Sequence, residues 1–324
     1  MEKNISKLKT FNLKIITGSE YNQKKIPMMQ FEAPHKGPVI WLTACAHGDE
    51  IGGIVIIQEL FRMLKKYGLT KGTVFSFPLM NPIGFETGSR NISFSKEDLN
   101  RTFPGDPKGT LAERIAYKIF TVITDTKPDL VIDLHNDWIN STPYAVLDNI
   151  GEDQEIAKKI LLYAEDSSLL IVQEGTEEDR ELSRTLTASL LRKSIPALTC
   201  EMGSSFTIDE KNVRYGLAAI WNILSRAGMT RPLSGPSAEI VDNPLKGKVL
   251  HYDEHPYASS SGIIRFMKKP KDLLKKGEAF AKIYSPFGVL LETLRAEADS
   301  IMLGYSDLSV SFPGKSVAAF GIIS

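Results

Sequence analysis

The side chains best suited to chemistry follow two apolar stretches of the chain. His47 and Glu50 come three residues apart on a turn after residues 39–46, and His135 ends the apolar run 130–134. Imidazole nitrogen and carboxylate oxygen both suit Zn²⁺, and a catalytic zinc site takes three protein ligands and leaves a fourth position to water. Each histidine alone could be a hydrogen-bonded core or surface residue. Together the three residues predict a site for one zinc ion per chain.

A further acidic residue ends another apolar run. Such runs end at His47, Asn81, His135 and Glu201, and in open parallel α/β sheets ligands bind at the carboxyl ends of the strands. Glu201 is therefore a candidate general base, because a carboxylate beside a zinc-bound water can take its proton and pass it to a leaving amine. A salt-bridged surface glutamate is the alternative.

Helices are expected between these strands. Residues 51–66 place apolar side chains on one helical face, and Thr110 and Glu113 form a capping box before a helix from 111 to about 124. Alternating strands and helices predict a parallel sheet. Further helices are expected at residues 152–162, 182–193 and 212–226, and the acidic run 174–181 is expected to be surface.

The longest stretch without periodicity, residues 81–110, carries Arg90, Asn100 and Arg101. Long irregular segments inside a domain are usually functional, and guanidinium groups pair bidentately with carboxylates. This loop could clamp a substrate carboxylate; the alternative is a solvated loop.

From about residue 234 helical periodicity disappears and short alternating runs between glycines take its place. We predict a domain boundary here, with a catalytic domain at 1–238 and a small all-β domain at 239–324. His251 and His255 lie four residues apart, but Pro256 and the lack of a helical pattern argue against a second metal site.

Composition limits the partners. Lysine plus arginine and aspartate plus glutamate both number 39 in 324 residues, which predicts no nucleic-acid or membrane partner. Cys45 and Cys200 lie in strand-like runs and no run is long enough to cross a bilayer, so a cytoplasmic protein without a disulfide framework is expected.

Taken together, the motifs resemble those of the succinylglutamate desuccinylase and aspartoacylase family, itself similar to the zinc carboxypeptidases. The resemblance covers roughly residues 38–225 and rests on His47-Gly48-Asp49-Glu50, Asn81-Pro82, Arg90, Asp98-Leu99-Asn100-Arg101, Asp133-Leu134-His135 and Glu201-Met202-Gly203. It implies a three-layer α/β/α domain around a mixed, mainly parallel eight-stranded sheet. It also implies that the C-terminal β domain is similar to a lipoyl-type half-barrel.

The resemblance also implies roles. His47, Glu50 and His135 would hold zinc, Glu201 would activate water, Arg90 would polarise the scissile carbonyl, and Asn100 with Arg101 would bind a substrate carboxylate. The expected activity is a zinc-dependent amidohydrolase, a deacylase that cleaves the non-peptide amide bond of an N-acylated amino acid or related small carboxylate. A zinc carboxypeptidase acting on short peptides and a non-catalytic binding protein that keeps the fold are the alternatives. The β domain could cover the catalytic mouth or build a homo-oligomer interface.

Overall fold

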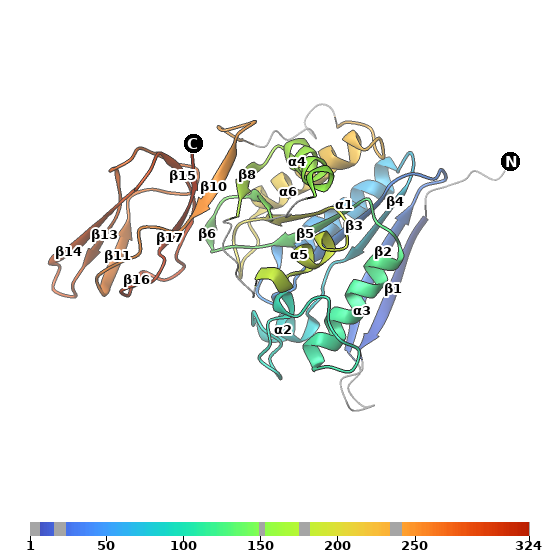
Figure 1. Ribbon diagram of the computed structural model, residues 1–324, viewed down its shortest axis with the longest axis horizontal. Helices are drawn as coiled ribbons and strands as arrows, with labels where there is room; N and C mark the ends of the chain where they lie inside the picture. Colours follow the sequence, from blue (N-terminus) through green and yellow to red (C-terminus); the bar gives the residue numbers. More distant parts are fainter. Residues whose placement is uncertain (1–6, 16–23, 149–152, 175–181, 234–241, 324) are drawn as a thin grey trace.

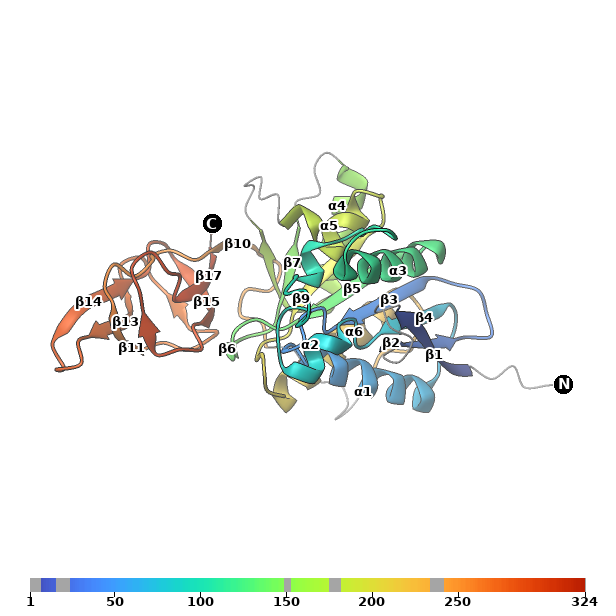
Figure 2. The ribbon, with the colours of Figure 1, turned by 90° about the horizontal axis from the view of Figure 1, so that it is seen from below.

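The computed structural model describes residues 7–15, 24–148, 153–174, 182–233 and 242–323. A long twisted sheet runs through the molecule, with helices on both faces and a second, smaller sheet at one end (Figure 1). Figure 2 shows helix α1 on one side of the central strands and helices α3 and α5 on the other. The predicted three-layer α/β/α architecture is confirmed.

The first eight strands of the sheet come from the N-terminal two-thirds of the chain. Their order is β1 (Lys7–Ile15), β2 (Lys24–Glu32), β4 (Thr73–Phe77), β3 (Val39–Ala44), β5 (Leu130–His135), β9 (Ala197–Glu201), β7 (Tyr144–Leu147) and β8 (Leu170–Gln173). The four strands β4, β3, β5 and β9 run parallel, β2 and β7 are antiparallel to their neighbours in this group, and the sheet is therefore mixed but parallel at its centre. Because both faces of the central strands are covered, most of their side chains are apolar: Ile40, Trp41 and Leu42 are fully buried.

Helices connect and cover these strands: α1 (Gly52–Tyr67), α2 (Pro82–Thr87), α3 (Leu111–Asp125), α4 (Gln154–Ser167), α5 (Leu186–Leu191) and α6 (Glu210–Arg226). The capping box of Thr110 and Glu113 forms as expected at the start of α3. The single helix expected over 182–193 is instead a 3-10 turn, η2 (Leu182–Arg184), followed by α5. The Thr185 side chain caps the start of α5 by accepting a hydrogen bond from Ala188 N. No helix in the described part of the chain is long and apolar enough to cross a membrane.

The segment 81–110 is less irregular than its sequence indicates. It contains α2, whose N-cap Asn81 accepts a hydrogen bond from Gly84 N, and the 3-10 turn η1 (Leu99–Arg101), whose N-cap Asp98 accepts from Asn100 N. Helical periodicity cannot reveal elements of three to six residues, since they complete less than two turns.

The C-terminal region consists of short strands, as predicted. Strands β11 (Gly262–Phe266), β13 (Ala279–Tyr284), β14 (Leu290–Arg295) and β16 (Val310–Ser311) form an antiparallel sheet of their own. Strand β10 (Val249–Asp253) instead pairs in parallel with β8, and β17 (Ala318–Ile322), β15 (Ser300–Tyr305) and β12 (Leu273–Leu274) extend the main sheet beyond it. The short strand β6 (Asn140–Ser141) also pairs with β15. The predicted boundary between 238 and 239 lies outside the described residues.

Candidate metal centre

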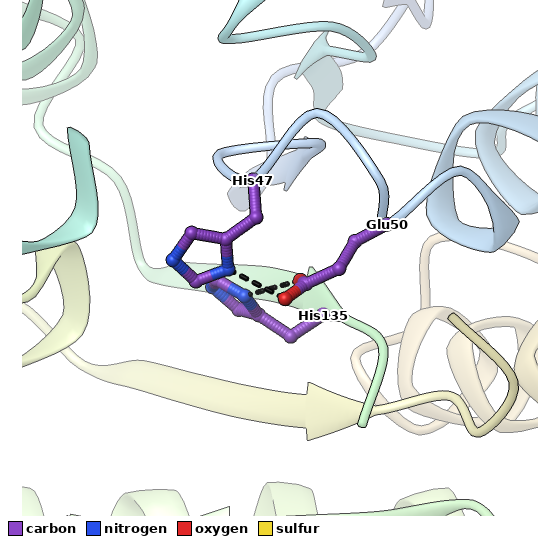
Figure 3. Close-up of side chains that lie close together, drawn as sticks. All are labelled: His47, Glu50 and His135. Atoms are coloured by element: carbon purple, nitrogen blue, oxygen red, sulfur yellow. Dashed lines mark hydrogen bonds and ion pairs between the residues drawn. The ribbon is translucent and has the colours of Figure 1, made fainter. Parts of the chain in front are cut away.

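The structure brings His47, Glu50 and His135 together at the carboxyl edge of the central strands (Figure 3). One potential ligand atom from each residue lies within 4.8 Å of the others, and all three residues are at most 4 % exposed. The two rings face one carboxylate: His47 Nδ1 lies 2.5 Å from Glu50 Oε1, and His135 Nδ1 lies 2.8 Å from Glu50 Oε2. Among the described residues this is the one group of three or more such side chains.

The turn that carries His47 and Glu50 is shaped by its backbone. Strand β3 ends at Ala44, and Cys45 then adopts a left-handed conformation with φ 55°, while its thiol donates to His47 O at 3.3 Å. Gly48 passes so close to α2 that a Cβ at this position would lie 2.0 Å from the Gly84 carbonyl carbon. The Gly in the motif is therefore needed for space.

Two further carboxylates hold the outer nitrogens of the rings. Asp98 Oδ1 lies 3.1 Å from His47 Nε2, and Asp133 Oδ2 lies 2.9 Å from His135 Nε2. Thr43 on the neighbouring strand donates to Asp133 Oδ1 at 2.6 Å and fixes that carboxylate. Carboxylates placed behind histidines in this way set the ring orientation and direct the other nitrogen towards a metal.

In the sequence, both aspartates stand out only as parts of motifs. A signal for Asp133 was available, because it lies two residues before His135 in a strand and so shares its face. For Asp98, 51 residues from His47, spacing offers no such signal.

The charges of the group support a cation site. Burial lowers the pKa of both histidines, but the nearby carboxylates outweigh it: Glu50 and Asp98 raise the pKa of His47, and Asp133 and Glu50 raise that of His135. Burial raises the pKa of Glu50, but the two histidines bring it well below its usual range. The Glu50 carboxylate is buried between two imidazole rings, and the group offers only nitrogen and oxygen donors. Such a donor set fits a divalent cation such as Zn²⁺.

Glu201 lies beside this group. It is the last residue of β9 and is in register with His135 on β5 and with Tyr144 on β7, so the three side chains share one face. Its Oε2 is buried and has no hydrogen-bond partner among the described residues. Burial raises the pKa of Glu201 well above its ordinary value, which is how a carboxyl group is tuned towards proton transfer near neutral pH.

The three predicted substrate-facing residues are placed differently from one another. Arg90 is half exposed; its guanidinium lies 3.1 Å from Asp98 Oδ2 and 3.5 Å from Glu50 Oε1, at the rim of the group. Asn100 is buried and already engaged, because its Oδ1 accepts from Leu186 N at 2.9 Å and its Nδ2 lies 3.3 Å from His135 Nε2. Arg101 is partly exposed and donates from Nη1 to Asn100 O at 3.0 Å.

Side chains that the sequence did not single out complete the surroundings. Asp137 accepts from Tyr144 Oη at 3.0 Å, and burial raises its pKa to about 6. From the C-terminal region, Tyr252 on β10 donates to Glu254 at 2.8 Å, and burial together with the charges of Asp137 and Glu254 raises the pKa of Tyr252. Strand β10 therefore reaches the same edge of the sheet as the candidate metal centre.

Within the described ranges, no other histidine belongs to a group of three or more potential metal ligands. His255 is exposed and its Nδ1 lies 2.8 Å from Asp253 Oδ1, while His251 lies in β10 opposite Ile322. Cys45 and Cys200 are free and buried. Of the acidic run 174–181, residues 175–181 lie outside the described residues.

Comparison with known structures defines the class first: the chain has a zinc-carboxypeptidase-like α/β/α fold. A metallo-carboxypeptidase from Burkholderia cenocepacia superposes with a TM-score of 0.56 at 14 % identity, covering 69 % of this chain and 65 % of that one. The model of the succinylglutamate desuccinylase/aspartoacylase catalytic domain matches residues 36–227, and the chain belongs to that family.

Three relatives each match at least 82 % of this chain. A succinylglutamate desuccinylase/aspartoacylase from Rhodobacter sphaeroides has a TM-score of 0.81 at 22 % identity, covering 99 % of this chain and 97 % of its own. The product-bound ectoine utilization protein EutE (DoeB) from Ruegeria pomeroyi has a TM-score of 0.80 at 19 % identity and complete coverage of both chains. An N-alpha-acetyl-L-2,4-diaminobutyric acid deacetylase from Halomonas elongata is 25 % identical over 280 residues, which are 82 % of this chain and 77 % of that protein.

Proposed function

We propose that this protein is a zinc-dependent deacylase that hydrolyses the amide bond of an N-acylated amino acid. The observation that carries the proposal is the buried group of His47, Glu50 and His135, with Glu201 in register beside it; Glu201 Oε2 has no hydrogen-bond partner in the described part of the chain. Family membership and the name of the Halomonas relative support the reaction class.

The three metal-type residues would hold the ion, and Asp98 and Asp133 would keep the two rings oriented towards it. When bound, a zinc ion would polarise the substrate carbonyl and lower the pKa of water. Glu201 takes a proton from the water that attacks the carbonyl carbon, and gives it to the nitrogen as the C–N bond breaks. The oxygen of the water ends in the carboxylate. One of its protons reaches the nitrogen through Glu201 and the other passes from the new carboxylic acid to the amine, so the products are a carboxylate and an ammonium group.

Arginines at the rim would bind and orient the substrate. Arg101 pairs with the carboxylate of the amino-acid part, since a guanidinium matches a carboxylate in shape and charge. Arg90 donates to the carbonyl oxygen as negative charge develops on it, which is the role of an oxyanion-stabilising donor. Asn100 lies beside this arrangement: its Oδ1 accepts from Leu186 N, and its Nδ2 lies close to the His135 ring.

The substrate class to test first is the N-acetylated diamino acids, because the Halomonas relative is named for N-α-acetyl-L-2,4-diaminobutyrate. Metal content is measured on protein purified without chelator, and released amine is measured on a panel of N-acetyl amino acids and of short peptides. We expect about one zinc per chain and hydrolysis of N-acetyl amino acids that chelation removes and zinc restores. Activity confined to peptides would make the protein a carboxypeptidase, and absence of both zinc and turnover would leave a binding role.

The matched variant is Glu201→Gln, which keeps the size of the side chain but cannot accept the proton. It should retain zinc and lose turnover by at least about 10²-fold. Full activity of this variant would refute the assigned role of Glu201.

A further inference from the structure

The turn that follows Glu201 has an unfavourable backbone conformation. Ser204 and Phe206 both have positive φ angles, 27° and 60°, and such values are costly for residues with a side chain, above all a bulky one. Strained backbone persists only where its surroundings hold it. The structure shows what holds this turn.

The side chain of Asn136 is the main polar support. Its Nδ2 donates both protons to the turn, one to Gly203 O and one to Ser204 O, the second at 3.2 Å. Asn136 is 6 % exposed, so water does not replace these bonds. Backbone bonds add to them: Ser205 N donates to Asp137 O at 3.2 Å and Phe206 N donates to Asp49 O at 2.9 Å.

Asn136 also contacts the metal-type residues. Its backbone N donates to Glu50 Oε2 at 3.1 Å, and it directly follows His135 in the chain. Gly52, at the start of α1, leaves room for its amide, because a Cβ at Gly52 would lie 2.8 Å from Asn136 Nδ2. One residue thus joins the Glu50 turn, the end of β5 and the turn after Glu201.

We propose that Asn136 is a positioning residue: its amide holds the turn 203–206, and through it fixes Glu201 relative to Glu50 and His135. The proposal rests on the proposed function for the reaction that Glu201 serves. An amide is required at this position, since an ionised aspartate offers no N–H and would face two carbonyl oxygens.

The test compares Asn136→Ala and Asn136→Asp with a control, Asn243→Ala. Asn243 is a fair control because its Nδ2 likewise donates to two backbone oxygens, Ser168 O and Leu169 O, away from the metal centre. We expect both Asn136 variants to keep about one zinc per chain and a KM within about twofold of wild type, while kcat falls about 10²-fold, as for a misplacement of about 1 Å. Asn243→Ala should leave kcat unchanged.

A second experiment separates positioning from a merely structural role. In Glu201→Asp the carboxylate is already displaced, so adding Asn136→Ala should reduce kcat much less than it does in the wild type; strictly additive losses would overturn the proposal. Loss of zinc in proportion to kcat would also overturn it, because Asn136 would then act through Glu50.

Hydrogen exchange provides a reading that needs no substrate. The backbone amides of Ser205 and Phe206 should exchange faster in Asn136→Ala. Unchanged exchange rates at these two amides would refute the proposal that Asn136 holds the turn. If wild type and Asn243→Ala both fail to turn over any N-acyl amino acid, the proposed function fails, and the exchange data still decide whether Asn136 holds the turn. Should Asn136→Ala fail to fold, as judged by circular dichroism, the similarly sized Asn136→Asp serves the same comparisons.

Discussion

Replacing Asp133 with asparagine should weaken metal binding without removing any proposed ligand. The side chain keeps its shape, but the negative charge 2.9 Å from His135 Nε2 is lost, and at 1 % exposure solvent screens that charge little. Loss of a carboxylate behind a metal-binding histidine typically costs 10- to 100-fold in metal affinity. This corresponds to about 1.4–2.7 kcal/mol. The upper part of this range is expected, because Thr43 holds the carboxylate in place from the neighbouring strand.

The assay is competition for zinc against a chromophoric chelator at fixed pH. Asp129→Asn is the matched control, because Asp129 precedes the same strand at its opposite end and accepts from Val39 N at 2.8 Å. Its zinc affinity should equal that of wild type. A zinc affinity of Asp133→Asn within twofold of wild type, or an equal loss in Asp129→Asn, would refute the reasoning.

Three further predictions concern Glu201, the two histidines and Arg101. Without metal, Glu201→Gln should have a higher Tm than wild type at neutral pH. Burial raises the pKa of Glu201, so the folded wild-type protein loses stability as the pH rises from about 4.5 through the raised pKa. The difference in Tm should vanish below pH 4.5. Zinc affinity should rise with pH above 6.5, because the raised pKa values of His47 and His135 make protons compete with the metal. Calorimetry in two buffers should detect the release of protons on zinc binding. Zinc binding without proton release would contradict the assignment of the two histidines as ligands. Arg101→Ala should raise KM for N-acetyl amino acids by about tenfold or more, the value of a charge-assisted hydrogen bond; an equal effect on substrates with an amidated carboxylate would contradict the proposed pairing.

The sequence could predict which strand ends meet because that information is local. An apolar run that ends in a polar residue needs no knowledge of distant contacts, and the geometry of parallel sheets then places such ends along one edge. His47, His135 and Glu201 were found in this way. The structure places His135 and Glu201 at the ends of β5 and β9, and His47 on the turn that follows the neighbouring strand β3. The roles of these residues in catalysis remain predictions.

The groups that the sequence did not reveal act through non-local contacts. Asp98 reaches His47 across 51 residues, and Asn136 reaches Gly203 across 67. Aspartate and asparagine are common at turns, so the local sequence pattern predicts only turn residues at these positions. The same limit applies to β10, whose Leu250 lies opposite Val172 of β8: a composition change marks a new region near residue 234, but not the strand that it will join.

The pairing of β8 with β10 has a consequence for the order in which the chain can fold. Strand β8 carries the apolar residues Leu170, Ile171 and Val172, all buried in the finished sheet. During synthesis its outer edge stays open until Val249–Asp253 has left the ribosome, and an open apolar edge invites pairing with other chains. A chain truncated before β10 should therefore aggregate, because the outer edge of β8, in the sheet that carries the candidate metal centre, is covered only by a strand that is synthesised later.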